Sequence, residues 1–212
     1  MTVKPDLRRT LDGYRARSGE LRLLDVPPQQ YLAIDGHGDP NGPGFVVAVR
    51  ALYPMAYAVK FDSKQRGRDY VVPPLEGLWW AEDMAAFTAA RDKSRWSWTL
   101  LILLPDWLGG VDVEAARARL TSTRRPERLA DVRLETLSEG RCVQTLHVGT
   151  FDDEAGVLHR LHHKFLPAQG LRPTGRHHEI YLSDFRRVAP ERRRTILRQP
   201  VVREGPPRRD LT

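Results

Sequence analysis

Glu179 and Tyr181 are the residues whose types and spacing are best suited to chemistry, and they lie in the segment 177–184 (HHEIYLSD). The segment reads as a strand, and side chains of a strand point alternately to its two faces, so Glu179, Tyr181 and His177 share one face. A carboxyl group among aromatic rings in a pocket can hold a cation, or keep a proton that it would lose in water, because burial raises its pKa. The alternative for this segment alone is a solvent-facing edge strand with ordinary polar side chains.

Composition predicts a folded protein without disulfides. The chain has 212 residues, 41% of them hydrophobic, with five Trp and one Cys, Cys142. This is too much apolar material for a solvated chain, and one cysteine cannot form an intramolecular disulfide. The first ten residues lack an apolar signal region, and no apolar run approaches the roughly 20 residues that span a bilayer. We therefore expect a soluble, cytoplasmic protein without a membrane partner.

Motifs for cofactors and metals are weak. The turn 36–44 is rich in glycine but has neither the GxxxxGK[ST] nor the GxGxxG pattern, so it favours a helix entry over a phosphate cradle. His159 and His163 are four residues apart on a predicted helix, but no third ligand accompanies them. We expect no cofactor and no bound metal.

The formal charge of +7 could indicate nucleic-acid binding, because clustered Arg and Lys neutralise phosphates. Many of the arginines lie between residues 186 and 209, interspersed with acidic residues and prolines, and no nucleic-acid motif accompanies them. A solvated basic surface is the better interpretation, so nucleic acid is not an expected partner.

The predicted elements repeat along the chain. A strand at 31–35 is followed by the Gly-bearing turn, by a helix from 45 to about 60 that Pro54 should kink or break, and by a strand ending in Trp79 and Trp80. Adjacent residues on a strand face opposite ways, so one Trp can join the core while the other lines a cleft. We further expect a helix at 82–91, a wholly apolar central strand after Trp98, and a hairpin in which 132–137 and 142–148 are joined at 138–141.

The second half resembles the first. The strand 143–148 ends in a Gly-bearing acidic turn at 149–153, a helix follows from about 153 to 166, and a loop leads to the strand at 177–182. Two such strand-helix-strand-strand units predict an α+β fold, with a pseudo-symmetric antiparallel sheet, helices on one side and a central ligand cleft between the halves. Aromatic residues of the first half would then face the acid of the second.

At this point the chain resembles a known family, the GyrI-like small-molecule-binding domains, which also serve as effector domains of multidrug-sensing transcription regulators. The resemblance covers nearly the whole chain and is carried by 31–40 (YLAIDGHGDP), 53–60 (YPMAYAVK), 74–80 (PLEGLWW) and 178–184 (HEIYLSD). It implies a ligand-binding domain at 21–202 with pseudo-repeats at about 21–110 and 111–202. The residues themselves predict a polar lead-in at 1–20 and, from their Pro, Gly and charge content, a flexible tail at 203–212. No helix-turn-helix module precedes the domain in this sequence, so we do not expect a complete transcription regulator.

The resemblance also implies a ligand and a site. Family members bind bulky planar, often cationic compounds against aromatic walls, with a glutamate on the strand that matches Glu179. The predicted ligand-binding residues are Tyr53, Tyr57, Trp79, Trp80, Glu179 and Tyr181. The stand-alone subgroup includes cyclopropyl hydrolases, which open the strained ring of duocarmycin-like DNA-alkylating compounds, a detoxification in which Glu179 and Tyr181 would be catalytic.

Three functions remain open at this stage. The first is multidrug-type binding of planar hydrophobic, often cationic molecules, and the second is cyclopropyl hydrolysis. The third is an interaction module for a DNA-associated enzyme, which the family name and the basic surface suggest. Product analysis with a cyclopropane-bearing alkylator separates the first two, and strong salt-sensitive DNA retention would favour the third.

Overall fold

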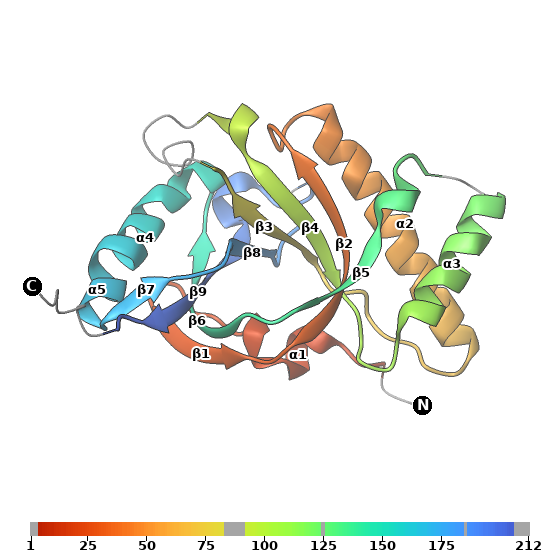
Figure 1. Ribbon diagram of the computed structural model, residues 1–212, viewed down its shortest axis with the longest axis horizontal. Helices are drawn as coiled ribbons and strands as arrows, with labels where there is room; N and C mark the ends of the chain where they lie inside the picture. The colour runs from red at the N-terminus through yellow and green to blue at the C-terminus, as the bar shows by residue number, and fades with distance from the viewer. Residues whose placement is uncertain (1–3, 83–91, 124–125, 185, 206–212) are drawn as a thin grey trace, which may run out of the picture.

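A computed structural model describes residues 4–82, 92–123, 126–184 and 186–205 (Figure 1). Its centre is a nine-stranded sheet in which the paired strands are antiparallel. In sheet order the strands are β1 (Arg22–Val26), β6 (Gly140–Val148), β9 (Arg194–Arg203), β8 (His177–Tyr181), β3 (Leu75–Trp80), β4 (Ser97–Leu103), β2 (Gln29–His37) and β5 (Arg133–Leu137), while β7 (Leu171–Pro173) pairs with β9. The α-helices are α1 (Leu7–Thr10), α2 (Pro43–Gln65), α3 (Gly110–Thr123), α4 (Ala155–Arg160) and α5 (Leu166–Ala168), and a π-helical stretch, Leu161–Phe165, joins the last two.

The strand order reads the same way outward from the centre, which confirms the predicted pseudo-symmetry. From β3 the sheet continues through β4 and β2, and from β8 it continues through β9 and β6. Each half is completed at its edge by the first strand of the other half: β1 pairs with β6, and β5 pairs with β2. The halves meet where Gly77 of β3 lies opposite Glu179 of β8.

The predicted hairpin at 138–141 is wrong, because β5 and β6 do not pair with each other: β5 forms one edge of the sheet, and β6 lies next to β1 at the opposite end. Glu139, which the hairpin would leave in an exposed turn, is buried, and its carboxylate binds His178 and Arg198. These ion pairs draw the connection into the sheet. The partners His178 and Arg198 lie on later strands, β8 and β9, so local turn chemistry could not indicate these ion pairs.

The two faces of the sheet are covered differently. On one face α2 packs on Leu32, Ile34, Leu100 and Ile102, and Leu161 and Leu166 of the α4–α5 segment pack on Val143. On the other face the N-terminal segment, with Leu7, Leu11 and Tyr14, covers Ala33 and Leu101 (Figure 1). Alternate residues of each strand thus serve two cores, which explains the wholly apolar run of β4.

The helix α2 begins where the glycine-rich turn predicts, with Gly42 as its N-cap and Pro43 in its first turn. Of the predicted kink or break at Pro54, the break is wrong, because α2 continues through it. Its neighbours Leu52 and Met55 are fully buried against the sheet, and this packing outweighs the hydrogen bond that proline removes. By length and composition α2 would also suffice to cross a membrane, but many of its side chains belong to the protein core.

The predicted strand that ends in Trp79 and Trp80 is present, and it starts at Leu75, after Pro73 and Pro74. The predicted helix at 82–91 lies almost entirely outside the described residues, as does the tail from 206 to 212.

Candidate functional site

Glu179, Tyr181 and Trp79 form one hydrogen-bonded group on the helix-covered face of the two central strands. The Tyr181 hydroxyl donates to Glu179 Oε2 at 2.8 Å, and Trp79 Nε1 donates to the Tyr181 hydroxyl oxygen at 3.0 Å. Gly77 leaves room for this contact, because a Cβ there would lie 2.8 Å from Trp79 Nε1 and 3.0 Å from the Tyr181 oxygen. We call Glu179, Tyr181, Trp79, His177 and Glu154 the central cluster.

Aromatic rings from both halves surround this cluster. Phe45, at the start of α2, stacks on Trp79 with ring centres 6.3 Å apart, and Trp96 meets Trp79 edge-on at 5.9 Å. Phe151 meets Tyr181 edge-on at 5.8 Å. The sequence reasoning missed all three of these rings. The internal duplication offered a signal for two of them, because Phe45 directly follows the Gly-bearing turn of the first half and Phe151 lies in the Gly-bearing turn of the second.

Burial controls the protonation of Glu179. Only 14% of its side-chain surface is exposed, and burial raises the pKa of Glu179 to about 7, although the Tyr181 hydrogen bond and the charge of His178 each lower it in part. Burial likewise raises the pKa of Tyr181 well above its ordinary value, so the phenol keeps its proton and acts as a donor. The site therefore holds a carboxyl group that changes charge near neutral pH.

His177 and Glu154 bring further titratable groups to the cluster. His177 Nε2 lies 3.7 Å from Glu179 Oε1, and burial lowers the pKa of His177 to about 3, which makes the imidazole neutral. Burial, and secondarily the charge of Glu179, raises the pKa of Glu154, which is only 5% exposed. Glu154 Oε1 and both ring nitrogens of His177 have no hydrogen-bond partner among the described residues. This leaves polar atoms facing inward without partners, as at a site that receives a ligand.

The remaining predicted residues lie elsewhere. Trp80 is on the opposite face of β3, with the guanidinium carbon of Arg176 3.7 Å from the centre of its ring. Tyr53 and Tyr57, both on α2, stack on each other with ring centres 6.5 Å apart. Together with Arg50 and other residues they line a hollow of about 840 Å³. The structure thus brings Trp79, Glu179 and Tyr181 together, and brings Tyr53 and Tyr57 together at a second location.

A buried ionic network lies behind the central cluster, on the other face of the same strands. His178 contacts Glu76 through Nε2 and Glu139 through Nδ1, both at 2.9 Å, and Arg198 binds Glu139 at 2.7 Å. The Tyr14 hydroxyl donates to Glu76, which ties the N-terminal segment to the network. Burial lowers the pKa of His178, but the charge of Glu139 and the hydrogen bonds to Glu139 and Glu76 together raise it to about 9, so a positive charge sits behind Glu179.

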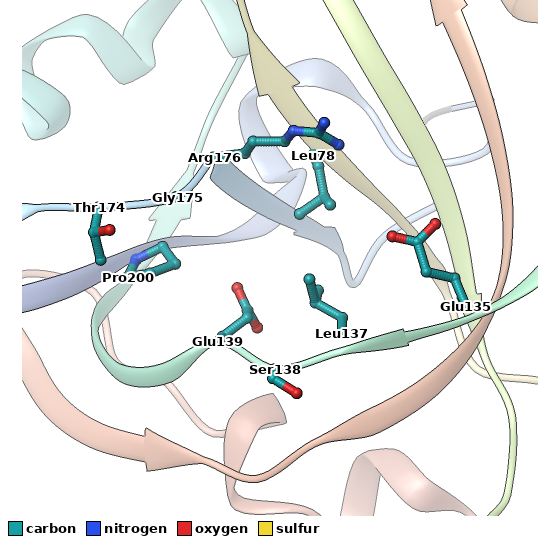
Figure 2. A pocket seen from close by; sticks show the side chains of 9 residues that line it. All are labelled: Leu78, Glu135, Leu137, Ser138, Glu139, Thr174, Gly175, Arg176 and Pro200. Atoms are coloured by element: carbon teal, nitrogen blue, oxygen red, sulfur yellow. The ribbon is translucent and has the colours of Figure 1, made fainter.

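A pocket of about 340 Å³ opens beside this network (Figure 2). Glu139 and Arg176 are among its lining residues, with apolar contributions from Leu78, Leu137 and Pro200. Both carboxylate oxygens of Glu139 are already bound, to His178 and Arg198, so its charge serves the network. Within the described part of the chain, no group of three or more His, Cys, Asp or Glu could hold a metal ion.

Comparison with known proteins agrees with this architecture. The family model for the GyrI-like small molecule binding domain matches residues 19–201. An uncharacterized conserved protein from Listeria innocua is 35% identical, with a TM-score of 0.85, and the match covers 94% of this chain and 100% of that one. A structure named as a hydrolase from Listeria innocua matches with the same identity and coverage and a TM-score of 0.82.

More distant similarity extends to a solved structure of low sequence identity. The EcmrR C-terminal domain is 10% identical, with a TM-score of 0.55, over 87% of this chain and 98% of that one, a likeness of fold alone. No protein with a curated description matches the sequence. The family match and the fold agree, and the chain belongs to the GyrI-like family of small-molecule-binding domains.

Proposed function

We propose that this protein is a cytoplasmic hydrolase that binds bulky, planar, hydrophobic molecules and adds water across a strained ring, as in the cyclopropane of duocarmycin-like alkylators. The observation that carries the proposal is the geometry of Glu179, whose Oε2 accepts a hydrogen bond from Tyr181 at 2.8 Å while its Oε1 makes no close hydrogen bond to any residue that the structure describes. Such a carboxylate is oriented and has an oxygen left to receive a proton. The 35% identity to a protein named as a hydrolase supports the same assignment.

The reaction needs a base and a held substrate. Glu179 takes a proton from water as the water oxygen bonds to the cyclopropane methylene. The bond between that carbon and the ring system breaks, and its electron pair moves through the conjugated dienone to the carbonyl oxygen, which is then protonated. The phenol of Tyr181 holds the Glu179 carboxylate in position, and Trp79 holds the phenol. General acid–base assistance of this kind contributes about 10² to 10⁴-fold in rate.

The raised pKa suits this role. A carboxylate with an ordinary pKa near 4.3 is a weak base, whereas a base whose pKa lies near the working pH combines availability with driving force. With a pKa of about 7, roughly half of the Glu179 side chains are ionised at neutral pH. The rings of Phe45, Trp79, Trp96 and Phe151 offer apolar surface against which a planar molecule can pack.

The test is product analysis with a cyclopropane-bearing alkylator. Wild-type protein should yield the ring-opened water adduct, and Glu179→Gln should lose at least about 100-fold in rate while binding the substrate within a few-fold. Glu114→Gln, on the exposed side of α3, is the matched control, because it makes the same chemical change at a side chain that is 68% exposed to solvent. Full turnover by Glu179→Gln would reject the assignment.

The second candidate is binding of a planar cation without turnover. It is favoured by the acidic pair Glu154 and Glu179 beside aromatic rings, because ring faces and a carboxylate both attract cations. Cation–π contact adds about 0.5 to 2 kcal/mol for each well-placed ring. Titration with a fluorescent planar cation measures this binding, and an absence of ring-opened product alongside tight binding would select this candidate.

A further inference from the structure

The turn that precedes α4 carries a buried acid to which the proposed reaction has given no role. Glu154 ends the 3₁₀ turn Phe151–Glu154, and 5% of its surface is exposed. Its Oε1 has no hydrogen-bond partner among the residues that the structure describes. Burying an unpartnered carboxyl group costs stability, which points to a partner that arrives with the ligand.

The turn is held firmly. The Thr150 hydroxyl donates to Asp153 Oδ2 at 2.6 Å, and the Thr150 backbone N–H donates to the same oxygen at 3.3 Å. His147 Nε2 donates to the carbonyl oxygen of Thr150 at 2.8 Å, and the N–H of Gly149 donates to the carbonyl oxygen of Arg193 at 3.0 Å. Glu154 is therefore presented by a braced turn, as a group that acts on a substrate needs to be.

The same turn packs against β8, the strand that carries Glu179, because Phe151 meets the ring of Tyr181 edge-on. The groups whose charge acts on Glu154 are Glu179 of β8 and Asp152 of its own turn, and Glu154 in turn acts on Tyr181. Two carboxyl groups that share a buried site do not both ionise readily, so Glu154 keeps its proton when Glu179 is ionised.

The other donors of the cluster are already occupied or too weak. The Tyr181 hydroxyl donates to Glu179, and Trp79 Nε1 donates to Tyr181. His177 is neutral, and a neutral imidazole does not release its remaining proton near pH 7. Glu154 is thus the remaining proton donor among the described groups of the cluster.

We propose that Glu154 is the general acid that complements Glu179, a role that rests on the proposed hydrolase function. As water bonds to the methylene carbon and the carbon–carbon bond breaks, the electron pair that collects on the dienone oxygen takes the proton of Glu154, while Glu179 takes the proton of the water. The sum is the addition of one water, and passage of a proton from Glu179 to Glu154 restores the starting state. The substrate class follows: an uncharged planar compound with a carbonyl acceptor conjugated to the strained ring.

The catalytic test compares pH profiles. Wild-type kcat/KM should rise as Glu179 ionises and fall at higher pH as Glu154 ionises. Glu154→Gln keeps a hydrogen-bond donor but cannot transfer a proton, so it should lose about 100-fold in kcat and lose the alkaline fall. The control Glu114→Gln should keep the wild-type kcat and the alkaline fall. If Glu154 had a purely structural role, Glu154→Gln would lower the melting temperature of the protein and leave the alkaline fall of kcat/KM in place. Unchanged kcat and profile in Glu154→Gln, with Glu179→Gln inactive, would overturn the acid role and leave the hydrolase proposal standing.

A binding test is independent of turnover. Acridone, an uncharged planar ketone with its own fluorescence, should bind wild type and Glu179→Gln alike. Glu154→Ala should bind it about tenfold more weakly, because one hydrogen bond to the ketone is lost, and Glu154→Gln should bind within a few-fold of wild type. If wild type fails to bind acridone, or Glu154→Ala binds it equally well, the role of Glu154 is rejected. If these binding differences appear but no alkylator is opened, the hydrolase proposal fails and the donor role stands.

Discussion

The rate of ring opening should follow the ionisation of Glu179 across neutral pH. The base form is required, and its pKa is about 7, so roughly one carboxyl group in eleven is ionised one pH unit below this value and ten in eleven one unit above. We therefore expect kcat/KM to rise about tenfold from pH 6 to pH 8. An exposed glutamate with a pKa near 4.3 would give a flat profile over this range.

Replacing the donor to Glu179 should move the profile in a known direction. The Tyr181 hydrogen bond lowers the pKa of Glu179, so Tyr181→Phe should shift the rise to higher pH. A hydrogen bond to a charged group contributes about 1.5 to 3 kcal/mol, and one pKa unit corresponds to about 1.4 kcal/mol, so the shift should be about one to two units. Initial rates across pH 5 to 10 measure it, with stability checked at each pH.

Tyr70→Phe is the matched control for this substitution. Tyr70 is fully buried and its ring packs against Trp107, away from the central cluster. The profile of Tyr70→Phe should coincide with that of wild type. A flat wild-type profile between pH 6 and 8, or a shift of Tyr181→Phe to lower pH, would refute the reasoning.

Three further predictions concern stability. Gly36→Ala should destabilise the protein by about 3 kcal/mol in urea unfolding, because its Cβ would lie 1.9 Å from the ring of Trp98, whereas Gly44→Ala, which meets open space, should be neutral or slightly stabilising. His178→Ala should cost about 3 to 5 kcal/mol in the same assay because it strips a buried carboxylate of its partner, and a cost below 1 kcal/mol would contradict the ion-paired network. Because the pKa of His178 is raised to about 9, the stabilisation that it contributes is present below about pH 6.5 and should be lost as pH rises to 9. The pKa of Glu139 is lowered to about 2, so the stabilisation that it contributes should be lost as pH falls from about 4.5 to 2. Melting curves across pH that lacked both declines would contradict these pKa values.

Local sequence patterns predicted much of the fold because they depend on neighbouring residues. The period of two in 177–184 placed Glu179 and Tyr181 on one face, and the glycine-rich turn 36–44 predicted the start of α2 at Pro43. The internal duplication predicted the pseudo-symmetric sheet, because each repeat supplies equivalent strands. Pro54 does not break α2, because core packing along the whole helix outweighs one missing hydrogen bond.

The make-up of the site could be predicted only in part. Glu179 and Tyr181 stand two apart on one strand, so their proximity follows from the sequence. The choice between Trp79 and Trp80 depends on which face of β3 meets α2, and a shift of one residue would exchange them. Phe45, Phe151 and Glu154 come from turns whose positions relative to β8 depend on contacts between distant segments.

By itself, the sequence determined which side chains alternate and where helices begin, because these properties arise over a few neighbouring residues. It also determined that the chain contains two related halves, because the same order of elements recurs along it. The tertiary structure alone decided that β5 and β6 lie in opposite halves of the sheet, that Gly77 lies opposite Glu179, and that Trp79 rather than Trp80 contacts Tyr181. It also decided the protonation of the site. The pKa of a carboxyl group depends on the water and the charges around it, and those around Glu179 are set by the packing of both halves.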